Sequence, residues 1–593
     1  MDKYEFAVLA ALKQHEGASQ RELQRAAGVS LGKVNGCVRN MTAQGYIENG
    51  RLTQAGEQAL APYKVENAII MAAGMSSRFA PLSYEKPKGL MLVKGEILIE
   101  RQIRQLHEAG ITDITVVVGY MKEKFFYLQQ KFGVKIVVNE DYYRYNNTST
   151  LIRVVDELKN TYVCSSDNYF VDNVFEQYVY EAYYSAVYFP GKCNEDGLIC
   201  NSRGKIIGIQ HEPEDMWCML GHVYFSRAFS QAFREVLLEQ YDQPETKNNL
   251  WERLYERNLD RLTMYIRRYD ADKVLEFDSL EDLRGFDDKY LENTDSKIFK
   301  NICKVLDCRE SDIMDIQVLK QGLTNLSFHF RCKGGEYVYR HPGVGTEAYI
   351  SRRSEAFSME AARRLGLDRT FIYANPEEGW KISHFIRNAR CMDYHNPQEV
   401  RQALGLMRKL HTAAVHSEYE VDIWEKTLDL IEKISAERKD FADFDELFHA
   451  IERLYQITRD DGVEKVLCHY DCYSPNFLIG EDGEMTLIDW EYSGNDDPAI
   501  DLGTFICCSD YNYEQVLEVL EIYYGREPEL KELRHDLAYV AIASYYWFIW
   551  AIYQESIGNT VGEYLLLWYQ STKTYLARAL ELYETNEGKG AKS

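Results

Sequence analysis

The chain has no Cys-x-x-Cys pair, and its 13 cysteines are an odd number. No zinc site or complete disulfide framework can therefore be assigned from the sequence. We expect reduced thiols, most of them buried as small hydrophobes, in a cytoplasmic protein. The N-terminus, Met-Asp-Lys-Tyr-Glu-Phe, also lacks the basic-then-apolar order of a signal peptide.

A convincing membrane span is missing too. The nearest segment, Leu537 to Tyr553, is rich in aromatic residues and marginally short for a bilayer, so we predict a buried helix there. Positive charge is scarce, because 68 Lys and Arg face 93 Asp and Glu and give a net charge of -25. This balance argues against duplex DNA or an anionic membrane as a partner for the whole surface. Local cations and Mg²⁺ can still bind anionic substrates.

What the chain has is length and ordinary globular composition. Its 593 residues, 46% of them hydrophobic, suggest roughly four structural units at about 150 residues per domain. The pattern of apolar residues changes twice along the sequence. We therefore predict a multidomain protein divided into residues 1–62, 65–290 and 295–585.

Residues 1–62 read as three helices followed by a short hairpin. Ser19-Gln-Arg-Glu22 matches a capping box, and Asn49-Gly50 predicts a tight hairpin turn. This order resembles the small MarR-like winged helix-turn-helix modules, whose third helix reads DNA. Basic residues are sparse, with Lys33 and Arg39 on that helix and Arg51 on the wing. DNA binding is therefore expected to be weak unless a homodimer doubles the contacts. A regulatory or protein-contact module is the alternative.

The second segment alternates strands with helices, which are expected over residues 97–109, 122–132 and 148–158. This alternation predicts a mostly parallel α/β sheet of Rossmann-like winding. Its first strand runs directly into Ala72-Ala73-Gly74, a small-residue turn whose backbone N–H groups can face a nucleotide. Arg78 and Lys88 follow and supply cations for a triphosphate. The combination AAGxxxR with a later PKxL predicts nucleotidyl transfer.

This segment resembles the nucleoside-triphosphate transferase family, and in particular its CTP:phosphocholine cytidylyltransferase branch. The matching motifs are AAGMSSRFAPL from residue 72, EKPK from 85, IERQI from 99 and YNNT from 145. The resemblance implies that Asp167, which follows a central strand, binds Mg²⁺ together with Glu276 and Asp278. The alternative for the last two is a pair of solvated surface acids.

The third segment contains His469-Tyr-Asp471-Cys-Tyr-Ser-Pro-Asn476 and then Ile488-Asp489-Trp-Glu491. In phosphoryl transfer of the kinase type, one Asp accepts the proton of the attacking hydroxyl, while an Asn and a second Asp hold the metal on the phosphates. We assign these roles to Asp471, Asn476 and Asp489. His469 is expected to brace the loop. Short strands come before these motifs and helices surround them, so we predict an α+β bilobal, protein-kinase-like domain.

Nucleotide contacts are predicted upstream of the catalytic loop. Gly322, Thr324 and Asn325 lie between two predicted strands and can cover phosphates, while Arg340 occupies the position of the strand cation. Glu355, on the following helix, is either the partner that fixes this cation or an exposed ion pair.

Residues 295–585 resemble the choline kinase and aminoglycoside phosphotransferase family. The resemblance implies ATP as donor and an amino alcohol as acceptor. Trp547 and Trp550 lie on one helix face and could enclose a quaternary ammonium, with Glu491 as the nearby acid. Two core tryptophans are the alternative.

Together these resemblances imply that choline and ATP give phosphocholine, which reacts with CTP to give CDP-choline. One alternative is a sugar-1-phosphate nucleotidyltransferase fused to another small-molecule kinase. The other is a transcriptional regulator that senses choline metabolites.

Overall fold

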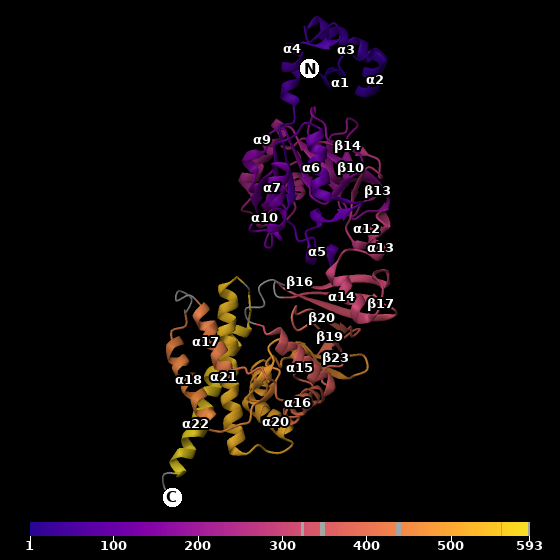
Figure 1. The fold of residues 1–593 in the computed structure, drawn as a ribbon. Helices are drawn as coiled ribbons and strands as arrows, with labels where there is room; N and C mark the ends of the chain where they lie inside the picture. The colour runs from indigo at the N-terminus through magenta and orange to yellow at the C-terminus, as the bar shows by residue number, and fades with distance from the viewer. Residues whose placement is uncertain (322–324, 344–349, 435–439, 559, 591–593) are drawn as a thin grey trace. The chain divides into compact units, whose positions relative to one another are not determined.

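The computed structural model describes residues 1–321, 325–343, 350–434, 440–558 and 560–590. The chain forms two compact units, Met1–Cys303 and Lys304–Ser593 (Figure 1). The predicted winged helix belongs to the first unit, and each unit has its own hydrophobic core.

The N-terminal module contains four helices and a hairpin. Its elements are α1 Lys3–Gln14, α2 Gln20–Ala27, α3 Leu31–Ala43, β1 Ile47–Glu48, β2 Arg51–Leu52, α4 Gln54–Leu60 and the 3₁₀ helix η1 Ala61–Tyr63. The predicted capping box is confirmed, because Ser19 accepts from the Glu22 N–H while Glu22 accepts from the Ser19 N–H. The hairpin turn is confirmed as well, with positive φ of 52° at Asn49 and 74° at Gly50.

A nine-stranded sheet forms the centre of the first unit, with the path β12-β11-β13-β8-β3-β6-β7. Four of its strands are parallel neighbours: β3 Asn67–Ala72, β6 Ile114–Val118, β7 Lys135–Val138 and β8 Thr161–Ser165. The rest extend the sheet with antiparallel pairs: β10 Tyr183–Lys192, β11 Gly197–Cys200, β12 Ile206–Gln210, β13 Glu214–Phe225 and β14 Tyr265–Tyr269, although β14 is parallel to β10. The expectation of a mostly parallel sheet therefore holds only for the strands near the Gly74 turn.

Short strand pairs complete this unit: β4 Leu92–Val93 with β5 Glu96–Ile97, and β9 Asn168–Phe170 with β15 Val274–Glu276. Its helices are α5 Leu82–Glu85, α6 Leu98–Glu108, α7 Tyr127–Phe132, α8 Thr148–Ile152, α9 Arg227–Gln240, α10 Pro244–Lys247, α11 Trp251–Arg257, α12 Leu280–Phe286 and α13 Lys289–Glu292. Four 3₁₀ turns join them: η2 Ser77–Phe79, η3 Lys88–Leu90, η4 Lys122–Phe125 and η5 Val155–Glu157.

Two helices differ from their predicted extents. The helix expected over residues 122–132 is divided into η4 and α7, and the one expected over 148–158 ends at Ile152 before η5. The β-branched pair Val154-Val155 follows this second end, and Val154 has φ -125°, outside the helical region. The expected helix over 97–109 is present as α6.

The second unit begins with a five-stranded antiparallel sheet. After α14 Lys297–Leu306, which crosses the unit boundary, come η6 Glu310–Asp312, β16 Ile313–Gln321, β17 Asn325–Cys332, β18 Gly335–Pro342, α15 Arg352–Arg364, β19 Phe371–Ala374 and β20 Lys381–His384. The order β16-β17-β18-β20-β19 confirms the predicted small β lobe.

A helical lobe follows. Its helices are α16 Pro397–Thr412, α17 Ile423–Lys433, α18 Phe444–Arg459, α19 Ala499–Cys507, α20 Tyr513–Tyr524, α21 Leu530–Ser556 and α22 Tyr564–Gly590. Short strands and a 3₁₀ turn carry its loops: β21 Arg390–Cys391, β22 Val466–Cys468, η9 Ser474–Asn476, β23 Phe477–Ile479, β24 Met485–Leu487 and β25 Gly494–Asp496.

Helix α21 is the central element of this lobe. It contains the segment from Leu537 to Tyr553 and packs against α17, α18, α19 and α22; Figure 1 shows α17, α18 and α22 beside it. No helix in the described part of the chain is long and apolar enough to cross a membrane. The prediction of a buried helix is therefore confirmed.

Close contact between α19 and α21 depends on Gly503. A Cβ at this position would lie 2.5 Å from the Tyr539 backbone oxygen. We expect Gly503→Ala to destabilise the second unit by about 1–3 kcal/mol, because backbone has to move. Gly405→Ala is the matched control, since Gly405 is an exposed helical glycine with open space, and it should be stabilising by roughly 0.5–1 kcal/mol. Urea unfolding, monitored by hydrogen exchange in α21, would measure both changes. Equal stability of the two variants would contradict the packing argument.

Candidate active sites

The first candidate site lies where β3 and β8 end. Strand β3 leads into Ala73, whose carbonyl accepts from the Tyr120 N–H at 3.1 Å. Gly119 makes this approach possible, since a Cβ there would lie 2.8 Å from the Ala73 oxygen. This hydrogen bond anchors the predicted turn at Ala72, Ala73 and Gly74. The turn lies at the C-terminal edge of the parallel strands, where α/β sheets bind ligands.

A buried lysine joins the predicted acids of this site. The Lys88 amine lies 2.8 Å from Asp167 Oδ2 and 3.8 Å from Glu276 Oε1, although the three residues are far apart in sequence. Next to it, Gly89 packs tightly on Ser166, since a Cβ there would lie 2.7 Å from the Ser166 hydroxyl oxygen. The structure therefore brings Lys88, Asp167 and Glu276 together at one point.

Asp278 adds a further acid to this group, since its charge acts on both Lys88 and Glu276. Its Oδ1 lies 3.2 Å from Arg78 Nη2, and the Arg78 side chain is largely exposed. Asp278 is therefore in the site, rather than a remote surface acid.

The electrostatics of this site show an excess of negative charge. Burial and the Asp167 charge raise the pKa of Glu276 to about 8. Burial would lower the pKa of Lys88, but Asp167 and Glu276 outweigh it and raise this pKa. Carboxylates grouped in this way are the oxygen ligands that Mg²⁺ uses.

Two further acids were not predicted from the sequence. Burial and the Asp278 charge raise the pKa of Glu195, which no motif marks. Glu252 accepts from the Tyr184 hydroxyl at 3.0 Å, and burial raises its pKa to about 7. The Asn147 amide lies 3.5 Å from Glu252, so the YNNT motif was the available signal for this part of the site.

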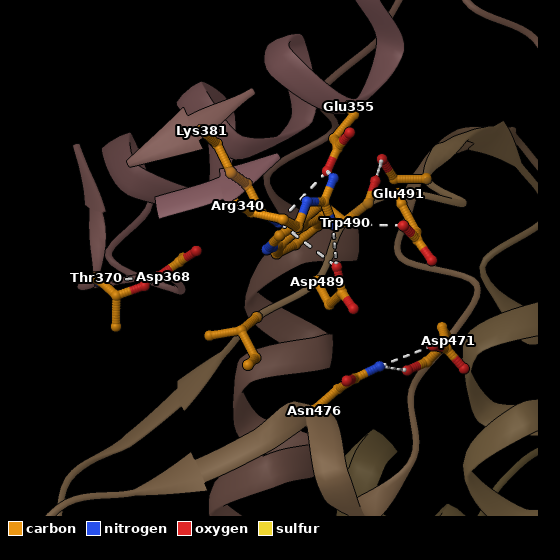
Figure 2. Close-up of polar contacts among 12 residues, drawn as sticks. Arg340, Glu355, Asp368, Thr370, Lys381, Asp471, Asn476, Asp489, Trp490 and Glu491 are labelled. Carbon is orange, nitrogen blue, oxygen red and sulfur yellow. Dashed lines mark hydrogen bonds and ion pairs between the residues drawn. The ribbon is translucent and has the colours of Figure 1, made fainter. Parts of the chain in front are cut away.

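The second candidate site is centred on Arg340, as Figure 2 shows. Arg340 is buried and pairs with Glu355, with Asp489 at 2.8 Å and with Glu491 at 3.3 Å. Glu355 is only 3% exposed, so the exposed-pair alternative for this residue is wrong. Lys381 was missed by the sequence analysis, and its amine lies 3.4 Å from Glu355 and 3.5 Å from Asp489.

The catalytic-loop residues lie below this cluster in Figure 2. The Asn476 amide donates to Asp471 Oδ2 and to the Asp471 backbone oxygen, each at 2.8 Å. His469 donates from Nε2 to the Ile488 oxygen at 2.9 Å and accepts the Asp471 N–H at Nδ1. His469 therefore braces the loop, as predicted.

The two acids of this site have opposite pKa shifts. Burial and the Asp489 charge raise the pKa of Asp471 to about 8. Burial would also raise the pKa of Asp489, but Lys381 and Arg340 overcome it and lower this pKa to about 2. A basic carboxylate beside a permanently ionised one suits proton acceptance next to metal ligation.

Gly322 and Thr324, two of the predicted nucleotide contacts, lie outside the described residues, and Asn325 begins β17.

Glu491 was predicted as the acid near the quaternary ammonium. In the structure its carboxylate pairs with Arg340, which is a predicted nucleotide residue. The predicted tryptophans lie in an aromatic cluster in α21 and α22. Trp547 has its ring centroid 5.5 Å from Trp550 and 5.8 Å from Trp568.

Tyrosines connect this aromatic cluster to the catalytic loop. Tyr492 lies 6.4 Å from Trp547, measured between ring centroids, and follows Glu491 directly. Burial and the Asp471 charge raise the pKa of both Tyr473 and Tyr546. The aromatic faces are thus near the predicted base. Trp568 and Tyr492 were missed because no motif marks them.

Comparison with known proteins divides the chain in the same order. Residues 1–48 match the winged helix-turn-helix DNA-binding family, residues 68–256 the MobA-like NTP transferase domain, and residues 316–535 the choline/ethanolamine kinase family.

Three relatives represent these matches. The choline-phosphate cytidylyltransferase of Streptococcus pneumoniae is 33% identical over 221 residues, which cover 37% of this chain and 96% of the relative. The 2-aminoethylphosphonate cytidylyltransferase of Lancefieldella rimae is 32% identical, covering 38% and 93%. The crystal structure of choline kinase LicA from Streptococcus pneumoniae has 24% identity and a TM-score of 0.41, covering 47% of this chain and 98% of LicA.

The raised pKa of Asp471 generates a stability prediction. Its folded-state pKa, about 8, lies above the ordinary value near 4, so the folded state holds this proton more tightly. The ionised side chain therefore costs folding free energy as pH rises from about 4 to about 8, by at most about 1.4 kcal/mol per pH unit. Asp471→Asn avoids this cost, and its stability advantage over wild type should grow across that range in buffer without divalent ions.

Urea unfolding at pH 5, 6.5 and 8 would measure the difference. Added Mg²⁺ should reduce it, because the metal stabilises the ionised group. A difference that does not change with pH would show that Asp471 titrates normally.

Proposed function

Because this chain belongs to the choline-phosphate cytidylyltransferase family and also carries a choline/ethanolamine kinase domain, we propose that it makes CDP-choline in two consecutive reactions. It is a bifunctional transferase. The second unit phosphorylates choline with ATP, and the first transfers the cytidylyl group of CTP to the phosphocholine. The observation that carries the proposal is that one chain holds two separate charge centres for phosphate chemistry, one in each unit.

In the kinase reaction, Asp471 accepts the proton of the choline hydroxyl as its oxygen attacks the γ-phosphorus, and ADP leaves. The Asn476 amide restrains the Asp471 carboxylate, which limits the search for the reactive orientation. Arg340 and Lys381 neutralise charge on the nucleotide, and Glu355 fixes both cations. We also propose that Gly322, Thr324 and Asn325 contact the phosphates of ATP.

In the cytidylyl transfer, a phosphate oxygen of phosphocholine attacks the α-phosphorus of CTP and pyrophosphate leaves. Lys88 is positioned to neutralise charge on the transferred group, and Arg78 can reach the outer phosphates from its exposed position. The turn at Ala72, Ala73 and Gly74 presents backbone N–H groups to the nucleotide.

The residues at both centres fit Mg²⁺. We propose Asp167, Glu276 and Asp278 as its ligands in the first unit, and Asn476 with Asp489 in the second. The fit rests on the donor set, which consists of carboxylates and an amide oxygen, and on the raised pKa of Glu276. When bound, the ion supplies positive charge to the phosphates at both centres.

The family matches do not favour a sugar-1-phosphate enzyme or a purely sensing regulator. The acceptor of the first unit has one specific competitor. A relative of nearly equal identity is named as a 2-aminoethylphosphonate cytidylyltransferase, so this phosphonate is our second candidate.

Single substitutions should separate the two activities. Asp471→Asn should abolish phosphocholine formation and leave cytidylyl transfer from supplied phosphocholine intact. Asp167→Ala should do the converse, so that phosphocholine accumulates. Mass spectrometry of reactions with choline, ATP, CTP and Mg²⁺ would identify the products, with phosphocholine or 2-aminoethylphosphonate supplied separately. If both folded variants lose both activities, the centres are not independent; if wild type makes no CDP-choline, the proposed function is wrong.

The aromatic cluster predicts substrate preference. Replacing Trp547 or Trp550 with Leu should raise the KM for choline by about 2- to 30-fold, since a cation–π contact contributes roughly 0.5–2 kcal/mol. Ethanolamine can donate hydrogen bonds and should be affected less. Trp424→Leu is the control, because Trp424 is buried against Tyr455 and Tyr545, outside the cluster. Equal losses for both alcohols would indicate core damage rather than a choline cage.

We propose weak DNA binding for residues 1–62. Lys33, Arg39 and Arg51 are exposed, but the Lys33 amine also lies 4.5 Å from the Tyr4 ring centroid, within the module. So few cations support at most micromolar affinity for a monomer, whereas a homodimer would double the contacts. Fluorescence anisotropy across a salt series would test this. Nanomolar, sequence-selective binding would make the protein a transcriptional regulator as well as an enzyme.

A further inference from the structure

Behind the catalytic loop of the second unit, three side chains with metal-ligating atoms come together. The ligating atoms of His411, Cys468 and Asp501 lie within 4.8 Å of one another, and all three residues are buried. Hydrogen bonds already occupy these atoms. Cys468 donates toward the Val466 and Asp496 carbonyls at 3.3 Å, and both Asp501 oxygens accept N–H groups. The cluster is therefore a closed hydrogen-bond network.

Asp501 connects this network to the catalytic loop. Its Oδ2 accepts the His469 backbone N–H at 2.9 Å, and its Oδ1 accepts the Tyr470 N–H at 2.6 Å. Tyr470 has a φ of 74°, a left-handed conformation that a bulky residue rarely adopts. Residue 471, the proposed base, comes next. The carboxylate thus holds a strained backbone that determines where the Asp471 side chain points.

His411, at the end of α16, completes the support of Asp501. Its Nε2 lies 2.9 Å from Asp501 Oδ2, and since a carboxylate only accepts, Nε2 is the donor. Its Nδ1 lies 2.7 Å from the hydroxyl of Tyr523 in α20, which donates to it when the imidazole is neutral. Burial alone would raise the pKa of Asp501, but the hydrogen bond from His411, with the charge of this imidazole when it is protonated, outweighs burial and lowers this pKa.

We propose that His411 is a positioning residue for the kinase reaction: by donating to Asp501, and with its ring oriented by Tyr523, it holds the His469-Tyr470 backbone so that Asp471 faces the substrate hydroxyl. This inference rests on the proposed kinase function of the second unit. Within the described part of the chain, the side-chain hydrogen bonds of His411 go to Asp501 and Tyr523, and neither is a proposed reacting group. Its effect should appear in kcat, because a displacement of about 1 Å at the base costs on the order of 10²-fold in rate.

A matched pair of variants tests the proposal in the full chain. His411→Gln can keep an N–H near the position of Nε2, whereas the shorter His411→Asn cannot reach Asp501. We expect His411→Asn to lower kcat for choline phosphorylation by roughly 10- to 100-fold, with the KM values for choline and ATP within about threefold. His411→Gln should recover most of this loss. Cytidylyl transfer from supplied phosphocholine should be unchanged and serves as the control in the same molecule.

Calorimetric titration with Mg²⁺ and a non-hydrolysable ATP analogue gives the fraction of folded sites, by which kcat is divided. Equal losses in the Asn and Gln variants, a loss that disappears after this correction, or unchanged kcat in His411→Asn would each overturn the proposal. Should His411→Asn not fold, Tyr523→Phe takes its place, and a kcat within error of wild type would overturn the proposal. A wild-type chain unable to phosphorylate choline would instead reject the proposed function.

Discussion

The pairing of a buried cation with more than one carboxylate is the interaction on which both active centres depend. Arg340 is only 5% exposed, and removing a guanidinium from water is favourable only with close anionic partners. Glu355, Asp489 and Glu491 supply them from a helix and from the segment after the catalytic loop. The β lobe and the helical lobe of the second unit are thereby joined through charge. The first unit has the same kind of pairing with fewer partners, since the buried Lys88 amine lies between Asp167 and Glu276.

Much of this arrangement was predictable because the essential residues lie in short motifs at strand ends. Asp167 follows β8, and the segment from His469 to Asn476 follows β22, so local sequence fixes what each strand delivers. Lys381 was not predictable in this way. It enters the second centre because β18 and β20 pair in a register that places Arg340 opposite Lys381, and no local pattern encodes that register. Trp568 likewise joins the aromatic cluster only because α22 packs on α21.

The fold shows the same division between local and distant causes. The Ser19 capping box, the Asn49-Gly50 turn and the parallel strands were predicted correctly, since each depends on a few neighbouring residues. The antiparallel extension of the central sheet was not foreseen. It joins β10 and β13 to the distant β14, and supports Tyr184 and Glu252 beside the first centre. Amphipathic alternation predicts a strand but not its partner or its direction. The positions of Tyr184 and Glu252 therefore could not be predicted from local sequence.

The balance of charge explains how so acidic a chain can handle polyphosphates. Around Lys88 and Arg78, four acids face two cations: Asp167, Glu195, Glu276 and Asp278. At the second centre, Glu355, Asp471, Asp489 and Glu491 face Arg340, Arg352 and Lys381. Burial, helped by a neighbouring carboxylate in each case, raises the pKa values of Glu276 and Asp471 to about 8. We therefore infer that a nucleotide accompanied by a divalent cation brings positive charge to these acids, so that metal and substrate would bind more favourably together than separately.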